Sequence, residues 1–141
     1  MSHKIYQYKW RVIYAETDQM GVVYYANYFI WFEAARSEFL RAIHLPYRAL
    51  EKQGIFLPVV EAFAKYLSPA YYEDEITVGL WIKEIKSVSL MIGYHIKREA
   101  DNTLLATGYT RHTILDKKGK IRKIPEELKN RSKEYIYNKE T

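Results

Sequence analysis

The chain has no cysteine among its 141 residues. Disulfide bonds, thiolate metal sites and cysteine nucleophiles are therefore excluded. It also has no apolar run near the ~20 residues of a membrane span, and its beginning, MSHKIYQYKWR, lacks the apolar segment of a signal peptide. From these absences we expect a soluble, cytoplasmic protein that does not insert into membranes.

Several catalytic motifs are missing as well. The sequence contains no GxSxG or SxxK pattern of a serine nucleophile, and no GxGxxG or GxxxxGK(S/T) loop for a nucleotide. Its histidines form no HExxH motif and have no partner at metal-ligand spacing, so we interpret all four as structural: His3, His44, His95 and His112. We expect neither a metal nor a cofactor.

Basic residues outnumber acidic residues only in the C-terminal region. The chain has 22 Lys or Arg and 17 Asp or Glu, a net charge of +5. Residues 117–141 hold nine basic residues and four Glu, so the whole excess lies there. Such a region can meet nucleic acid, an anionic membrane or a phosphorylated small molecule, and a solvated surface is the alternative. Because the charge is confined to this end and no RNP-like motif occurs, we do not expect nucleic-acid binding.

Length and periodicity indicate how the chain is organised. A chain of 141 residues is expected to form one domain, residues 1–141. The chain has 14 tyrosines, and exposed tyrosine side chains often lie at subunit interfaces or line ligand grooves. Residues 6–14 alternate between apolar or aromatic and polar side chains, which predicts a strand with one buried face. Four further runs have strand character: 60–66, 76–82, 88–96 and, less regularly, 104–115.

Residues 26–43 carry a strong helical pattern. Apolar side chains recur there at three- to four-residue spacing and form a single stripe: Tyr28, Phe32, Ala35, Phe39 and Ile43. The first half of the segment is apolar nearly all round, so we expect the helix to be buried at its N-terminal end and to emerge toward its C-terminal end. Shorter helices are expected at residues 47–53 and near the C-terminus, the latter with Pro125 at its first position.

The links between the predicted strands are short, as in SPAYYED, IKS and ADN, and short links favour antiparallel neighbours. One long helix also needs a surface that buries it, and a curved antiparallel sheet supplies such a surface. The sequence therefore predicts an α+β fold in which a sheet of about five strands wraps one long central helix.

The stretch ETDQMGVVYYANY, residues 16–28, is the candidate functional segment. Asp18 lies in a turn-forming run, and Tyr25 follows seven residues later, where the long helix is expected to begin. A helix N-terminus presents unpaired N–H groups and a partial positive charge, and among aromatic side chains it would form an oxyanion site in a low dielectric. Asp18 is then either a nucleophile or a base beside that site, or only the cap of a turn in which Gly21 takes a positive φ.

The segment TDQMGVVYYANYFIWFEAAR resembles the signature of hotdog-fold acyl-CoA thioesterases of the 4-hydroxybenzoyl-CoA thioesterase and YbgC type. The likeness continues in LPVVEAFAKYLSPAYYEDEITV and in IPEEL, so it covers nearly the whole chain. The shared frame is an Asp, a Gly three residues on, then Val-Tyr and Asn-Tyr, and it is filled here by Asp18, Gly21, Val23, Tyr24, Asn27 and Tyr28.

This resemblance implies the hotdog fold, a homodimer or homotetramer with active sites at the dimer interface, and hydrolysis of an acyl-CoA to a carboxylic acid and CoA. It places the catalytic carboxylate at Asp18 and the backbone N–H that polarises the thioester carbonyl at Tyr25. Many YbgC-type members have His where this chain has Tyr25, which removes a side-chain acid or base role, but the 4-hydroxybenzoyl-CoA enzymes also carry Tyr there. Whether Asp18 is a base or a nucleophile stays open.

The resemblance also implies substrate contacts. The signature is expected to contribute Gly21, Val23, Tyr24, Asn27 and Tyr28. The phosphates of CoA are expected to contact basic residues near the C-terminus: Lys117, Lys118, Lys120, Arg122 and Lys123. Of these, Lys120, Arg122 and Lys123 are the predicted substrate-binding residues. A non-catalytic module that binds acyl groups on CoA or on acyl carrier protein is the alternative function.

Overall fold

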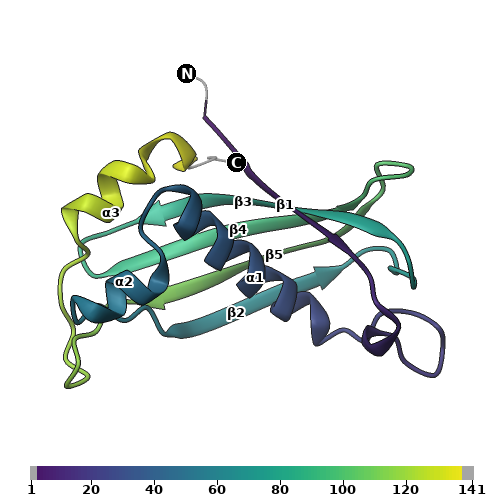
Figure 1. The fold of residues 1–141 in the computed structure, drawn as a ribbon, viewed down its shortest axis with the longest axis horizontal. Coiled ribbons are helices and arrows are strands. Elements are labelled where there is room, and N and C mark those ends of the chain that lie inside the picture. Colours follow the sequence, from purple (N-terminus) through teal and green to yellow (C-terminus); the bar gives the residue numbers. More distant parts are fainter. Residues whose placement is uncertain (1–2, 138–141) are drawn as a thin grey trace.

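The computed structural model describes residues 3–137 of the chain (Figure 1). Within these residues, five antiparallel strands form one sheet in the order β1-β3-β4-β5-β2. The strands are β1 (Tyr6–Arg11), β2 (Val59–Tyr66), β3 (Glu75–Ile85), β4 (Ser89–Arg98) and β5 (Leu104–Thr113). This curved sheet and its few helices confirm the predicted α+β class.

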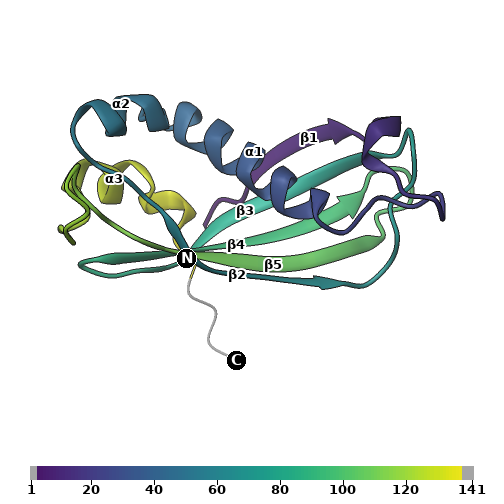
Figure 2. The same cartoon turned by 90° about the horizontal axis from the view of Figure 1, so that it is seen from below.

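The α-helices of the described residues lie on one face of the sheet (Figure 2). They are α1 (Asn27–Ala42), α2 (Tyr47–Lys52) and α3 (Glu126–Arg131). The 16 residues of α1 confirm the helix predicted at 26–43 to within one residue at each end. The C-terminal helix begins one residue later than predicted, because Pro125 is its N-cap residue. None of the helices in residues 3–137 is long and apolar enough to cross a membrane.

The alternation of residues 6–14 predicts a longer strand than β1, which ends at Arg11. Instead of a strand, the short 3₁₀-helix η1 (Tyr14–Glu16) follows. The cause is local, because the Glu16 carboxylate accepts the Ile13 N–H at 3.0 Å and the Glu16 N–H bonds to the Ile13 carbonyl oxygen at 3.0 Å. These bonds replace the ladder bonds of a strand and turn the chain.

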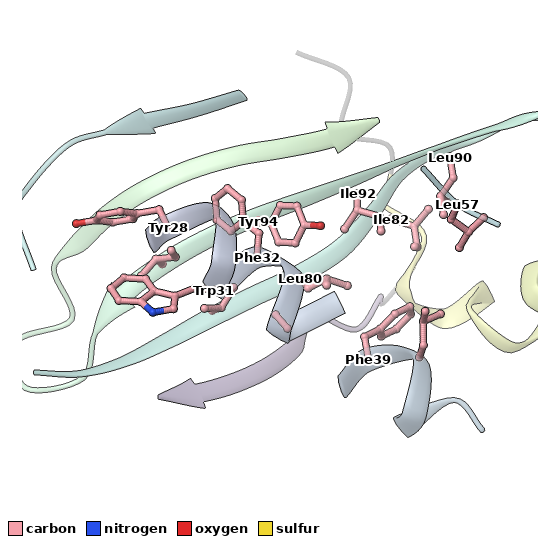
Figure 3. Close-up of a cluster of buried hydrophobic side chains, with 14 of the residues drawn as sticks. Tyr28, Trp31, Phe32, Phe39, Leu57, Leu80, Ile82, Leu90, Ile92 and Tyr94 are labelled. Carbon is pink, nitrogen blue, oxygen red and sulfur yellow. The ribbon is translucent and has the colours of Figure 1, made fainter. Parts of the chain in front are cut away.

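The predicted stripe of α1 packs against the sheet. All five of its residues are buried. The Phe32 ring stacks on Tyr94 of β4 with the ring centroids 4.2 Å apart (Figure 3), and full burial of such a side chain contributes about 1.5–3 kcal/mol. The expectation that the first half of the helix is buried all round is wrong, because only one side of α1 meets the sheet and Ile30 is 57% exposed.

The link between β2 and β3 does not join neighbouring strands, contrary to the prediction from its length. β1 and β4 occupy both edges of β3, so no edge is left for β2, which pairs with β5. The link, residues 67–74, therefore crosses the end of the sheet. On its way it meets the candidate functional segment, since the Val23 N–H bonds to the Ala70 carbonyl oxygen at 2.9 Å.

β2 buries neither of its faces, although the alternation predicts one buried face. Seven of its eight residues are exposed and Ala64 is half-buried. The reason is its place at the edge of the sheet, with β5 as its one neighbour in the strand order. Val60 and Phe63 are thus apolar surface in the single chain.

A chain of hydrogen bonds runs through the core between α1 and the sheet. The Arg36 guanidinium donates to the Tyr94 hydroxyl at 3.3 Å, and that hydroxyl lies 2.8 Å from the Thr110 hydroxyl. Thr110 lies 2.9 Å from Nε2 of His112, whose Nδ1 lies 2.9 Å from the Leu57 carbonyl oxygen. Because a carbonyl oxygen only accepts, Nδ1 carries the proton of a neutral ring. Burial lowers the pKa of His112 to about 4.

His112 should make the fold sensitive to acid. Its pKa is about 4 in the folded chain and about 6.5 in an unfolded chain, so the unfolded state binds this proton first as the pH falls. The stabilisation is fully present above pH ~6.5 and is lost as the pH falls to 4, by roughly 3 kcal/mol. Denaturant unfolding at pH 7 and pH 4 should therefore show a loss larger by about that amount in the wild-type chain than in His112→Gln. Equal losses in the two chains would contradict this role.

Candidate active site

Residues 16–28 fold back on themselves as a closed loop. Thr17 pairs with Val23 in an isolated antiparallel bridge, and the Asp18 N–H bonds to the Val22 carbonyl oxygen at 2.9 Å. Gly21 takes a φ of +83°, which confirms the predicted turn, and its N–H donates to the Asp18 carbonyl oxygen at 3.0 Å. The loop therefore holds Asp18 in place through its backbone.

Asp18 uses one carboxylate oxygen to cap this turn. Oδ1 accepts the Met20 N–H at 2.8 Å, and the residue is half-buried. Across residues 3–137, Oδ2 has no hydrogen-bond partner and no ion-pair partner. The turn-capping interpretation is therefore correct for Oδ1, and Oδ2 is free to act as a base or a nucleophile.

The start of α1 leaves backbone donors without an acceptor. The N–H groups of Asn27, Tyr28 and Phe29 each bond to the carbonyl three residues earlier, and the N-cap residue Ala26 makes no side-chain cap. In the described part of the chain, the N–H groups of Tyr25 and Ala26 have no hydrogen-bond acceptor. Free N–H groups at the N-terminus of a helix bind anions and stabilise oxyanions.

The expectation of a low dielectric at this helix end is wrong for the single chain. Tyr25 is 59% exposed and the neighbouring Tyr24 is 47% exposed, with their ring centroids 4.8 Å apart. Because both side chains face solvent, the nearby donors can be removed from water only when a ligand or a second subunit covers them.

A hollow of about 290 Å³ lies beside these donors. It is lined on one side by Val22, Val23, Tyr25 and Tyr28, and on the other side by Tyr66 of β2 and residues 67–69 of the crossing link. The Tyr66 hydroxyl donates to the Tyr25 carbonyl oxygen at 3.2 Å. Its ring meets the Tyr28 ring edge-on with the centroids 5.0 Å apart, and burial raises the pKa of Tyr28. The hollow therefore presents neutral, aromatic surface, which suits an acyl group.

The hollow brings together Val23, Tyr25 and Tyr28, but not the other predicted signature residues. The Asn27 side chain is committed elsewhere, because its Nδ2 donates to the Glu16 carbonyl oxygen at 2.8 Å. Gly21, Tyr24 and Asp18 do not line the hollow. Tyr66 was not predicted, because the short link that follows it indicated that β2 pairs with β3; the one available signal was an aromatic residue just before that link.

A second hollow, of about 280 Å³, lies at the opposite end of β2. Its lining includes Glu33, Arg36 and Ser37 of α1 and residues 57–59, which lead into β2. The first hollow adjoins Tyr66, at the other end of that strand. Within one chain, the two hollows are therefore separated by the length of β2.

The predicted phosphate contacts surround a third hollow, of about 450 Å³, between the end of α2 and the turn that follows β5. Lys123 does not line it, but five other cations do: Lys52, Lys117, Lys118, Lys120 and Arg122. In the part of the chain that the structure describes, none of these five forms an ion pair, although ten pairs form elsewhere. The Asp116 carboxylate accepts backbone N–H groups of this turn instead. The hollow is therefore an unneutralised basic surface.

The basic hollow lies far from Asp18 in a single chain. β5 ends beside the start of β2, since His112 pairs with Val59. The turn that carries Lys120 and Arg122 follows β5 and is at that end of the sheet. The structure thus does not bring the predicted phosphate contacts to Asp18 within one copy.

The histidines are not brought together either. His95 on β4 lies opposite Thr107, whereas His112 on β5 lies opposite Leu90. Over residues 3–137, no group of three or more His, Asp or Glu side chains could hold a metal ion. His112 instead belongs to the buried hydrogen-bond chain, which agrees with the structural interpretation of this residue.

Comparison with known proteins identifies the family. Residues 12–131 match the family model of the thioesterase-like superfamily. The chain belongs to this superfamily. It is 33% identical to the acyl-CoA thioester hydrolase YbgC of Escherichia coli O6:H1, over 74% of this chain and 78% of that protein.

Solved structures agree with this thioesterase-like assignment. A hypothetical protein from Thermus thermophilus is similar with a TM-score of 0.84 at 37% identity, over 92% of this chain and 98% of that one. The 1,4-dihydroxy-2-naphthoyl-CoA thioesterase from Synechocystis is similar with a TM-score of 0.85 at 25% identity, over 91% and 95% of the two chains. The hotdog fold and the family resemblance drawn mainly from residues 17–36 are therefore confirmed.

Proposed function

We propose that this chain hydrolyses the thioester of an acyl-CoA and releases a carboxylic acid and CoA, with residues 1–141 forming one thioesterase domain. The observation that carries the proposal is that one loop holds both a free carboxylate oxygen, on Asp18, and free N–H donors, on Tyr25 and Ala26. An aromatic hollow beside the donors offers room for an acyl group. The name of the relative YbgC, an acyl-CoA thioester hydrolase, supports the substrate class.

In the proposed reaction, the thioester carbonyl oxygen accepts the Tyr25 N–H. Negative charge develops on this oxygen when the carbonyl is attacked, and preorganised N–H donors stabilise it. Asp18 is either the base that takes a proton from the attacking water, or the nucleophile that forms an anhydride for water to cleave. In both routes the C–S bond breaks, and the CoA thiolate leaves and takes up a proton.

Two copies of the chain are proposed to pair through β2. The strand exposes Val60 and Phe63 at an edge of the sheet, and an exposed apolar edge is a template for pairing. Antiparallel pairing centred on Phe63 sets Glu61 of one copy opposite Lys65 of the other, so that their charges are complementary. The same pairing brings the start of the second β2 beside Tyr66 of the first copy, next to the uncovered helix end.

This pairing also gives the basic hollow a place in the reaction. Because paired β2 strands run in opposite directions, the basic hollow of one copy lies at the end of the dimer where the other copy holds Asp18. Lys120, Arg122 and the adjacent Lys123 are proposed to contact the CoA phosphates there through charge-assisted hydrogen bonds. The substrate would then lie across both copies.

Asp18→Asn should abolish hydrolysis and keep the fold. The amide oxygen of Asn can still accept the Met20 N–H that closes the turn, but the amide cannot act as a base or a nucleophile. We expect kcat to fall by at least ~100-fold. The assay is thiol release from a panel of aromatic, short-chain and long-chain acyl-CoAs.

Asp101→Asn is the matched control for this experiment. Asp101 also caps a turn, because its carboxylate accepts the Thr103 N–H at 3.1 Å, and it lies outside the proposed site. This variant should keep near-normal turnover. Near-normal turnover by Asp18→Asn would refute the role of Asp18, and binding of acyl-CoA without thiol release by the wild-type chain would favour the non-catalytic module.

Two substitutions at Tyr25 distinguish the role of its backbone N–H from the role of its side chain. Tyr25→Phe keeps the N–H and the ring, so it should retain most of the activity. Tyr25→Pro deletes the N–H at a position near a helix start, where Pro is sterically tolerated. Losing one oxyanion donor costs roughly 2.7–4 kcal/mol, or about 10²–10³-fold in kcat. Circular dichroism and oligomer size must first show that the Pro variant is folded, and equal inactivation by Phe would disprove the backbone role.

The pairing through β2 predicts an oligomer that depends on charge. Light scattering should show a dimer or tetramer for the wild-type chain at micromolar concentration. Lys65→Glu should weaken it, because Glu61 and the new carboxylate then face each other. Lys133→Glu, an exposed change on the 3₁₀-helix η2 (Lys133–Tyr135), is the control and should leave the assembly intact. A stable and active wild-type monomer would rule the pairing out.

A further inference from the structure

The side chain of Glu16, two residues before Asp18, is occupied by three hydrogen-bond donors. Oε1 accepts the Trp10 indole N–H at 3.1 Å and the Ile13 N–H at 3.0 Å. Oε2 accepts the Trp31 indole N–H at 2.9 Å. These donors come from β1, from the turn that follows it, and from the buried side of α1, so one carboxylate ties three parts of the fold together.

The backbone of Glu16 holds the far end of the same loop. Its carbonyl oxygen accepts the Tyr24 N–H at 2.9 Å and the Asn27 Nδ2 at 2.8 Å. Tyr24 and Asn27 flank the free N–H groups of Tyr25 and Ala26. Glu16 is therefore the common anchor of the chain just before Asp18 and of the chain around the free donors.

We infer that Glu16 is a positioning residue for thioester hydrolysis, which sets the separation between the Asp18 carboxylate and the Tyr25 N–H. This inference rests on the proposed function. Both groups must act on the same carbonyl, and a misplacement of about 1 Å can cost about 100-fold in rate. The turn between them is held by its own backbone hydrogen bonds and by the bond from Val23 to Ala70, and the hydrogen bonds of Glu16 tie both ends of this loop to β1 and α1.

The chemistry of the three donors calls for a carboxylate. A carboxylate only accepts hydrogen bonds, and all three partners donate. Glu16→Gln keeps the size of the side chain but turns an NH₂ group toward a donor, which leaves at least one of the donors unpaired. If Glu16 served stability alone, this variant would lower the free energy of unfolding and leave the kinetics of the folded protein unchanged.

The tryptophans provide a direct readout of these hydrogen bonds. The chain contains three of them, Trp10, Trp31 and Trp81. Trp81 lies on β3 with its ring centroid 5.4 Å from that of His95, so it serves as an internal reference. In proton–nitrogen correlation spectra of Glu16→Gln, the indole signals of Trp10 and Trp31 should move while the signal of Trp81 stays in place.

The same samples give the kinetic readout. We expect Glu16→Gln to lower kcat for the best acyl-CoA of the panel by at least ~10-fold, with KM changed by less than ~3-fold, because the alignment of Asp18 is lost and the phosphate contacts remain. Glu51→Gln on α2 is the control, since Glu51 is exposed and α2 lies at the opposite end of the molecule from the loop (Figure 1). It should change neither the kinetics nor the indole signals.

Each outcome decides between the alternatives. A folded Glu16→Gln with wild-type kcat overturns the inference, and so does a lower kcat without movement of the two indole signals. If Glu16→Gln does not fold, Trp10→Phe replaces it, because it removes one donor and keeps the carboxylate; an unchanged kcat in that variant also overturns the inference. A wild-type chain that cleaves no acyl-CoA overturns the proposed function as well, whereas an active Glu16→Gln overturns the inference alone.

Discussion

The contact between the apolar stripe of α1 and the sheet determines where the other parts of the molecule lie. The stripe runs the length of the helix, and Phe32 in its first half stacks on Tyr94 of β4 (Figure 3). A helix held along its whole length cannot slide, so both of its ends have fixed positions over the sheet. The N-terminal end meets the crossing link, and Arg36 in the second half enters the buried hydrogen-bond chain to His112.

The uncapped start of α1 connects this packing to function. A Ser, Thr, Asp or Asn at the N-cap position would accept the N–H of Tyr28 or Phe29 and stabilise the helix by about 1 kcal/mol. The chain has Ala26 there, with no side-chain cap. Just before the helix, the N–H groups of Tyr25 and Ala26 have no acceptor within residues 3–137, so a substrate oxygen can accept them. The cap that Asp18 makes is directed at its own turn, through one oxygen only.

Local chemistry made much of the fold predictable. The 3.6-residue period of α1 and the turn at Gly21 depend on neighbours in the sequence, and both were predicted correctly. The strand order was not, because it depends on which distant edges pair; β2 was expected beside β3 and lies beside β5. The early end of β1 was also missed, since it results from the hydrogen bonds of Glu16.

The residues of the candidate site also differ in whether the sequence could reveal them. Asp18 and Tyr25 could be selected from one short segment and from a family resemblance, and their roles stay predictions. Tyr66 could not be selected, because only the pairing of β2 with β5 and the crossing link bring it to the hollow. Glu16 was missed because its indole partners lie six residues before it and fifteen residues after it, on different elements.

The proposed function requires that the free carboxylate oxygen of Asp18 and the free donors of Tyr25 and Ala26 together cleave a thioester. The most direct measurement is steady-state release of free CoA by the purified wild-type chain, with the carboxylic acid product identified by mass spectrometry. We expect repeated turnover of at least one acyl-CoA, with acid and CoA formed in equal amounts. Binding of acyl-CoA without turnover, across aromatic, short and long acyl groups, would contradict it.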